Sequence, residues 1–269
     1  MAKLADNSAT APAAGPQQQQ SGAATRVVKV LTMNTHKGFN HFNRRFVLPE
    51  LREAVRLVSA DIVFLQEVQG VHEHHAKSVR NWPSLPQYEF LADQIWPDFA
   101  YGQNSVYPHG HHGNAVLSKF PILRHRNVWI TVHGAEVRGL LHCELQVPGQ
   151  AEFHVICVHL GLHEHERQLA LGVLGEMLTD LPAHAPVVVA GDFNDWRQRA
   201  GARLGPLGMH EAFERDRGKV ARSFPALFPA LRLDRIYARN LVTRAPQVLS
   251  RRPWSRLSDH LPLLAEVHL

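Results

Sequence analysis

From residue 26 onward the chain is a series of short apolar runs separated by polar stretches. Residues 27–33 are rich in β-branched side chains and predict a strand, and residues 62–65 predict a second, buried strand. Between them, apolar residues from Phe46 to Val58 recur at helical spacing, with Pro49 acceptable only near the first turn. The chain therefore begins as strand, helix and strand.

The remainder of the chain predicts more strands than helices. Strands are expected at residues 115–118, 141–146, 153–158, 187–190, 235–237 and 263–267, and a helix around residues 169–178. Residues 69–113 contain four prolines and several histidines, so we expect mainly loops there, with one or two short elements. Runs of strands with interspersed helices favour two packed sheets flanked by helices.

Residues 1–25 differ in composition from the rest. They are rich in alanine and glutamine, carry only two charged side chains and contain no apolar stretch typical of a signal peptide. We expect residues 1–25 to form a disordered tail and residues 26–269 to form one catalytic domain. Because residues 1–25 contain no such apolar stretch, we expect a cytoplasmic protein.

Composition excludes several classes of protein. Hydrophobic residues make up 45% of the chain and charged residues 20%, which excludes a disordered or collagen-like chain. Two cysteines exclude a disulfide framework. The longest apolar run, residues 185–190, is far shorter than the roughly 20 residues that span a bilayer, so we expect no stable membrane insertion.

Basic charge is concentrated in one segment. Residues 197–256 carry 14 basic and 4 acidic side chains, whereas the rest of the chain is acidic overall. This asymmetry suits a protein that meets a polyanion on one side and holds a cation on another, although a solvated arginine-rich surface would have the same composition.

Polar side chains gather at the ends of the predicted strands. They are Asn34, Glu67, His159, Asp192, Asn194, Asp234, Asp259 and His260. Each one alone is explained better by a turn, a helix cap or a solvated strand end than by a functional site. Strand ends at one edge of a sheet converge in space, however, so these separate segments are able to build one site.

The types of side chain favour one chemistry. Carboxylate and amide oxygens favour a hard cation such as Mg²⁺ or Mn²⁺ over zinc. Such an ion needs only one or two carboxylates, which leaves others for acid–base chemistry beside the histidines. The set therefore predicts metal-dependent hydrolysis of a phosphate ester.

Five short motifs then carry a resemblance to a known superfamily. They are LQEV at residues 65–68, VHL at 158–160, GDFND at 191–195, LDRI at 233–236 and SDH at 258–260. In this order they resemble the endonuclease/exonuclease/phosphatase (DNase I-like) superfamily, and the resemblance extends from residue 27 to the C-terminus. GDFN with a distal SDH is specific as a pair. Residues 111–122, 159–168 and 222–237 further resemble the small bacterial YbhP-like group.

The resemblance implies a fold and a cofactor. The fold is of the α/β class (α+β type), a four-layer α/β/β/α sandwich with its site at one edge of the paired sheets. The implied cofactor is Mg²⁺ or Mn²⁺, with Glu67 as the principal metal ligand, helped by Asn34 and Asp259.

The resemblance also implies catalytic roles. Asp192 would activate or orient the attacking water, and Asn194 would position the phosphate. His260 would stabilise negative charge on the phosphoryl group, and Asp234 would hold an imidazole in the right tautomer. His159 would face the phosphate on the leaving-group side.

Two departures from the family pattern leave points open. Some members pair the histidine equivalent to His159 with a glutamate, and the nearest candidate here is His112, which leaves the general acid unidentified. His36 stands where some members carry an acidic residue, which argues against a second metal position and leaves the number of metal ions open. We expect His112, Asn114 and Arg197 to contact the substrate.

Three functions agree with these observations. The first is a metal-dependent phosphodiesterase, specifically a monomeric nuclease acting on DNA, because the basic segment favours a polyanionic substrate. The second is a phospholipid-headgroup or inositol-phosphate phosphodiesterase or phosphatase, against which we note the lack of a membrane-seeking helix or exposed aromatic hairpin. The third is a non-catalytic, anion-binding scaffold, which would need neither Asp192 nor His260.

Overall fold

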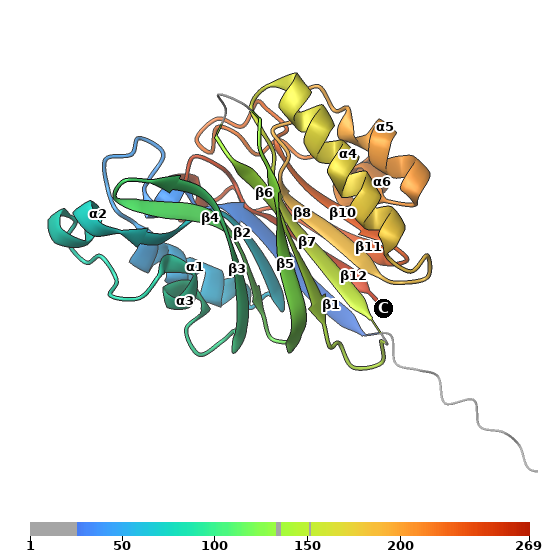
Figure 1. Ribbon diagram of the computed structural model, residues 1–269, viewed down its shortest axis with the longest axis horizontal. Coiled ribbons are helices and arrows are strands. Elements are labelled where there is room, and N and C mark those ends of the chain that lie inside the picture. Colours follow the sequence, from blue (N-terminus) through green and yellow to red (C-terminus); the bar gives the residue numbers. More distant parts are fainter. Residues whose placement is uncertain (1–25, 133–135, 151) are drawn as a thin grey trace, which may run out of the picture.

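The computed structural model describes residues 26–132, 136–150 and 152–269, which form two mixed six-stranded sheets packed face to face (Figure 1). The first sheet has the order β11-β12-β1-β2-β4-β3. Its strands are β1 (Val27–Asn34), β2 (Ile62–His72), β3 (Asp98–Tyr107), β4 (Gly110–Ser118), β11 (Val242–Val248) and β12 (Leu263–His268). The expected tail, residues 1–25, lies outside the described residues.

The second sheet has the order β5-β6-β7-β8-β10-β9. Its strands are β5 (Ile122–Ile130), β6 (Arg138–Leu145), β7 (Phe153–His159), β8 (Val187–Asp192), β9 (His210–Glu211) and β10 (Asp234–Arg239). In each sheet one central pair is parallel, β1 with β2 and β7 with β8, and the other pairs are antiparallel.

Helices cover the outer face of each sheet (Figure 1). The helices are α1 (Leu48–Val58), α2 (Glu73–Ser78), α3 (Gln87–Ala92), α4 (Glu164–Asp180), α5 (Ala200–Leu204) and α6 (Ala212–Arg217), with 3-10 turns η1 (His36–Gly38), η2 (Gly205–Leu207) and η3 (Trp254–Arg256). Helices α1 and α3 pack on the first sheet, and α4 and α5 on the second. This arrangement confirms the expected α/β/β/α sandwich.

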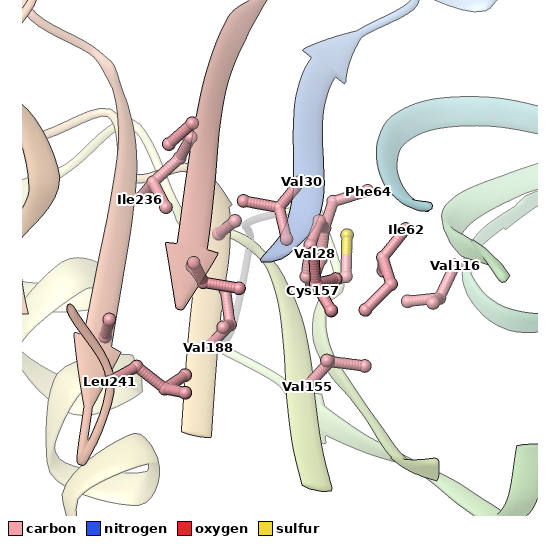
Figure 2. Packing of buried hydrophobic residues seen from close by; sticks show 14 of the residues in the cluster. Val28, Val30, Ile62, Phe64, Val116, Val155, Cys157, Val188, Ile236 and Leu241 are labelled. Atoms are coloured by element: carbon pink, nitrogen blue, oxygen red, sulfur yellow. The ribbon is translucent and has the colours of Figure 1, made fainter. Parts of the chain in front are cut away.

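The central strands are apolar on both faces because both faces are buried. In β1, Val28 and Val30 point into the core between the sheets, whereas Leu31 and Met33 pack under the helices. Figure 2 shows the core between the sheets, where side chains of β1 and β2 meet those of β7 and β8. Two-sided burial explains why these strands read as continuous apolar runs.

The prediction for residues 69–113 was wrong. This region contains the end of β2 and the long hairpin of β3 and β4, as well as the short helices α2 and α3. Strands β5 and β11 also lie where no strand was predicted. Strands β3, β5 and β11 are edge strands of their sheets, and an edge strand that is partly solvated needs no apolar run to form.

Within residues 26–132, 136–150 and 152–269 no helix combines the length and apolar character that crossing a membrane requires.

Candidate active site

The two parallel strand pairs bring the predicted site residues to one edge of the sandwich. Asn34 is the last residue of β1, and Glu67 lies beyond the point where β2 runs alongside it. His159 and Asp192 end β7 and β8 and are paired with each other in the parallel ladder. Asp234 is the first residue of β10 and lies opposite Asp192. Five strands from two sheets thus bring side chains to one place.

A bulge in β2 aims Glu67 at this place. The pairing of β2 with β4 shifts register between Leu65 and Val68, so two residues of β2 have no regular partner there. Glu67, in the middle of the shift, adopts a left-handed backbone conformation with φ of 54°. Side chains other than glycine rarely adopt this conformation, and its occurrence at a candidate ligand is the kind of strain found at functional sites.

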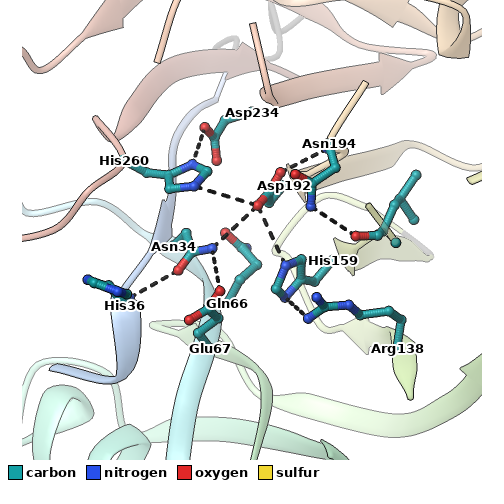
Figure 3. A network of polar contacts seen from close by, with 12 residues as sticks. Asn34, His36, Gln66, Glu67, Arg138, His159, Asp192, Asn194, Asp234 and His260 are labelled. Carbon is teal, nitrogen blue, oxygen red and sulfur yellow. Dashed lines mark hydrogen bonds and ion pairs between the residues drawn. The ribbon is translucent and has the colours of Figure 1, made fainter. Parts of the chain in front are cut away.

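Asp192 lies at the centre of the site and is buried (Figure 3). Its Oδ1 accepts a hydrogen bond from the backbone N–H of Asn194 at 2.9 Å. Its Oδ2 accepts from the side-chain amide of Asn34 at 3.3 Å. The Nε2 atoms of His159 and His260 lie 3.6 and 3.8 Å from the same oxygen. Three separate segments of the chain therefore converge on one carboxylate oxygen.

Asn34 connects Asp192 to the other acidic residues. Its Nδ2 donates to Glu67 Oε1 at 3.2 Å as well as to Asp192, and its Oδ1 accepts from the backbone N–H of His36. The Ser258 hydroxyl donates to the backbone carbonyl of Asn34 at 2.7 Å and lies 3.3 Å from Asp259 Oδ1. Glu67, Asp192 and Asp259 thus belong to one polar network.

Asp234 and His260 form a buried pair. His260 Nδ1 lies 2.9 Å from Asp234 Oδ2, so the imidazole donates to the carboxylate from Nδ1 and presents Nε2 to Asp192. Burial alone would lower the pKa of His260, but the charges of Asp234 and Asp192 outweigh burial and raise it to about 10. His260 is therefore a cation at neutral pH.

Burial shifts the pKa of the Asp192 carboxyl group upward, whereas it shifts the pKa of the His260 imidazole downward. Burial raises the pKa of Asp192 to about 6, and the charges of Asp234 and Glu67 raise it as well, whereas the charge of His260 lowers it. A base whose pKa lies just below neutral is ionised at pH 7 and still holds a proton well, which suits general base catalysis.

On the other side of Asp192, His159 has a partner that the sequence did not reveal. Arg138 Nη1 lies 3.2 Å from His159 Nδ1. Arg138 in turn pairs with Glu136 at 3.0 Å, and Glu136 pairs with His112 Nε2 at 2.9 Å. Neither Arg138 nor Glu136 belongs to a recognisable motif, and only the cross-strand pairing of Gly139 with His159 brings Arg138 to the site.

The three residues expected to bind substrate have different surroundings. His112 is buried and contacts Glu136. Asn114 is fully buried between the sheets and donates to the backbone carbonyls of Gly139 and Cys157, a position that fits a structural role. Arg197 is exposed in the loop after β8, close in sequence to Asn194.

The donor set fits a hard divalent cation. Glu67 and Asp259 keep about one fifth of their side chains exposed, with oxygen atoms facing the polar network. Asp192, Asp234 and His260 also have atoms within 4.8 Å of one another, a spacing that a metal ion could bridge. His260 is a weak candidate for a ligand, since its Nδ1 is bonded to Asp234 and the cation has no free lone pair. We therefore favour the part of the network around Glu67 as the place where a cation would bind.

A buried carboxylate between two histidines, at the edge of an α/β/β/α sandwich and beside oxygen donors for a cation, defines a hydrolase of phosphate esters. The chain belongs to the Endonuclease/Exonuclease/phosphatase family, whose model matches residues 31–260.

Similar sequences and structures agree with this assignment. The chain is 59% identical over 244 residues to the uncharacterized protein YbhP of Escherichia coli strain K12, across 90% of this chain and 96% of that protein. An endonuclease/exonuclease/phosphatase from Beutenbergia cavernae has a TM-score of 0.75 at 21% identity, covering 91% of this chain and 72% of its own. Truncated TDP2 of Caenorhabditis elegans has a TM-score of 0.66 at 21% identity, covering 90% and 98%. The two structures share the fold.

Proposed function

We propose that this protein is a Mg²⁺- or Mn²⁺-dependent phosphodiesterase that hydrolyses nucleic acid, with DNA as the leading substrate. The observation that carries the proposal is the convergence of Asn34, His159 and His260 on one oxygen of Asp192. A non-catalytic scaffold has no need for a buried carboxylate held among three donors, because burial of a charge is costly.

Each residue has a distinct part in the hydrolysis. Asp192 takes a proton from the attacking water, whose oxygen forms a bond to phosphorus opposite the leaving oxygen. Cationic His260, held by Asp234, stabilises the negative charge that grows on the phosphoryl oxygens. Asn194 orients the phosphate; its backbone N–H donates to Asp192, and its side-chain amide nitrogen donates to the Leu160 carbonyl at 3.0 Å.

Glu67, Asn34 and Asp259 are the residues that would hold the cation. When bound, such an ion polarises a phosphoryl oxygen and lessens the charge that the protein must stabilise. In the described structure the Asn34 amide donates to the two acidic side chains, so ligation by its oxygen requires the amide to turn over.

Exposed basic side chains favour nucleic acid as the substrate. Arg197 and Arg199 lie in the loop after β8, and Arg222 lies just before Ser223, which contacts the backbone of Asp234. Phosphate contacts by such side chains supply most non-specific affinity for DNA. Two arginines of the basic segment are structural instead: Arg235 and Arg239 are buried and donate to backbone carbonyls.

One observation favours a second candidate, hydrolysis of a phospholipid headgroup. Contrary to our expectation from the sequence, an aromatic side chain is exposed on a hairpin-like turn beside the site. Phe224 and Leu231 form a bridge, and Phe228 between them is 84% exposed. The turn is tied to the site by the bond from Ala226 N–H to the Asp259 carbonyl. Exposed apolar side chains at a rim are typical of contact with an apolar surface.

A substrate panel tests both candidates. Purified protein is incubated with plasmid DNA, an abasic-site duplex, RNA, sphingomyelin vesicles and inositol phosphates, each with Mg²⁺, with Mn²⁺ and with EDTA. Asp192→Asn, which keeps the shape of the side chain but removes the base, is the control. We expect cleavage of DNA that needs the metal ion and falls by about 10²–10⁴-fold in the variant.

Two other results of the panel would contradict the nuclease proposal. Turnover of the lipid substrate with no cleavage of nucleic acid would overturn the nuclease proposal and support the second candidate. Binding of DNA without turnover, equal in wild type and Asp192→Asn, would identify a scaffold.

A further inference from the structure

The two histidines beside Asp192 differ in the partner of their second ring nitrogen: one faces a hydrogen-bond acceptor and the other a donor. His260 Nδ1 faces the Asp234 carboxylate, which accepts a hydrogen bond. His159 Nδ1 faces the Arg138 guanidinium, which is only able to donate. A donor opposite Nδ1 requires a lone pair on that nitrogen. The proton of His159 must then lie on Nε2, and the ring must be neutral.

Arg138 is held in this position by its own partners. Its side chain is 12% exposed, and its second nitrogen pairs with Glu136 Oε2 at 3.0 Å. The other oxygen of Glu136 accepts from buried His112. The hydrogen bond from His112 lowers the pKa of Glu136 to about 2, and the charge of Arg138 contributes to the same effect, so Glu136 is ionised at neutral pH. The guanidinium therefore has an anionic partner, itself 42% exposed, on the nitrogen that does not face His159.

The other groups around His159 also favour the neutral form of its ring. The charged or titratable groups that face His159 are Asp192, Arg138, His112, His260 and Lys37. Burial and then the charge of Arg138 hold the pKa of His159 well below its usual range. The cations Arg138, His260 and Lys37 outnumber the single carboxylate of Asp192, which agrees with the neutral ring that the hydrogen-bond direction requires.

We propose that Arg138 is a positioning residue that locks His159 in the neutral Nε2–H tautomer, so that His159 donates a hydrogen bond to the substrate phosphate but does not protonate the leaving group. In the hydrolysis proposed above, the bond from water oxygen to phosphorus forms and the bond from phosphorus to the leaving oxygen breaks. Asp192 receives the proton of the water, and the leaving oxygen takes its proton from solvent. This inference rests on the proposed function only for the role of the hydrogen bond, not for the tautomer.

The tautomer is measurable without any substrate. Long-range ¹H–¹⁵N spectra of the full-length labelled protein distinguish Nε2–H, Nδ1–H and doubly protonated rings, and the signals of His159 are assigned by their loss in His159→Gln. At pH 7 we expect His159 as neutral Nε2–H and His260 as the doubly protonated cation. A protonated or Nδ1–H ring at His159 would overturn the proposal.

Variants of Arg138 test its part in fixing the tautomer. Arg138→Lys keeps a cationic donor and should keep the Nε2–H tautomer. Arg138→Met removes the donor, so His159 should no longer be held as Nε2–H and should populate the Nδ1–H tautomer as well. Arg124→Met is the matched control, since Arg124 pairs with Glu144 on an exposed edge strand and should leave the His159 signals unchanged. Should Arg138→Met fold poorly, Glu136→Gln removes the anionic partner of Arg138 and should weaken the preference of His159 for Nε2–H in the same direction.

Kinetics then test the role of the hydrogen bond. Two phosphodiester substrates that differ only in an aryl or an alkyl leaving group are compared in wild type and His159→Ala. A hydrogen-bond donor to the phosphate should cost about the same factor, about 10²–10³, with both substrates. A loss at least tenfold larger with the alkyl leaving group would identify His159 as the general acid and overturn this role. Lack of turnover of any phosphate ester, with the tautomer as expected, would overturn the proposed function and leave the assignment of Arg138 intact.

Discussion

The Asp192 carboxylate lies between two imidazoles whose states are set by residues behind them. Asp234 makes His260 a cation, and Arg138 faces His159 as a donor. The same side-chain type therefore serves two purposes within one site. The direction of one hydrogen bond on each ring decides which purpose it serves.

The pH dependence of activity follows from Asp192 and His260. Asp192 must lose its proton to act as a base, and its pKa is about 6; His260 must keep its proton, and its pKa is about 10. We expect kcat/KM to rise through about pH 6 and to fall near pH 10. A pH–rate profile at saturating Mg²⁺ checks this expectation.

Asp234→Asn supplies the control for that profile. The amide removes a charge that raises the pKa of both His260 and Asp192, so the alkaline fall in kcat/KM should move toward neutral pH and the acidic rise should move to lower pH. An alkaline fall at the same pH in both proteins would show that His260 is not the group responsible.

The backbone at Glu67 gives a second prediction at the scale of a residue. Both Glu67→Ala and Glu67→Gly remove the carboxylate, but only glycine adopts a φ of 54° without steric cost. Glu67→Gly should be about 1 kcal/mol more stable than Glu67→Ala, or about 2–4 °C in Tm, while both should lose metal-dependent activity. Thermal unfolding of the two variants measures the difference, and equal Tm values would argue against strain at this bulge.

Sequence predicted the centre of the site better than its periphery. Asn34, Glu67, Asp192 and His260 stand in short motifs at strand ends, and the structure joins them in one network. Arg138 and Glu136 carry no such signal. Their part depends on which residue of β6 lies opposite His159, and cross-strand register is a property of the folded sheet.

At the scale of elements, the two parallel strand pairs bring the site together. Their ends meet at one edge only if the strands approach closely. Gly191 makes this possible in β8: it has a φ of 147°, and a Cβ atom there would lie 2.0 Å from the Val158 carbonyl oxygen of β7. Close packing of the two backbones thus requires a glycine directly before Asp192.

Gly191→Ala should therefore disturb both folding and catalysis. We expect a loss of at least about 1–3 kcal/mol in the free energy of unfolding, together with reduced turnover, because the strand carrying Asp192 must move. Gly172→Ala in α4 is the matched control: its Cβ would meet no atom within 4 Å, so it should be neutral or stabilise the helix by up to about 1 kcal/mol. Denaturant unfolding of both variants checks the pair, and similar stability for the two would contradict the packing argument.

The strands that sequence missed share a physical reason. β3, β5 and β11 lie at sheet edges and are partly solvated, so their sequences mix polar and apolar residues without a clear period. The central strands β1, β7 and β8 are buried on both faces and were predicted within one or two residues of their ends. A strand that is buried on both faces has a continuous apolar run, and such a run can be recognised in the sequence.

At the scale of the molecule, the residues that stabilise the sandwich and the residues of the polar site lie in different places. One apolar core lies between the sheets and two more lie under the helices, while the polar network occupies one edge. The exposed arginine Arg197 after β8 and the exposed turn at Phe228 favour nucleic acid and lipid respectively, and the substrate panel decides between them.

Removal of residues 1–25 tests the predicted domain boundary. Arg26 is tied to the fold, since its backbone carbonyl accepts from the N–H of Leu269. A chain that begins at residue 26 should keep the Tm and the kcat/KM of the full-length protein. Thermal unfolding and kinetics of both chains check this, and a fall of several degrees in Tm would place part of the first 25 residues within the folded domain.

The most direct test of the central claim is the rate of phosphodiester hydrolysis as a function of Mg²⁺ concentration, compared in wild type and Glu67→Gln. The account predicts that turnover saturates with Mg²⁺ in the wild type, vanishes in EDTA, and in Glu67→Gln requires far more Mg²⁺ or is lost. Turnover that persists in EDTA, or that is unchanged in Glu67→Gln, would contradict it.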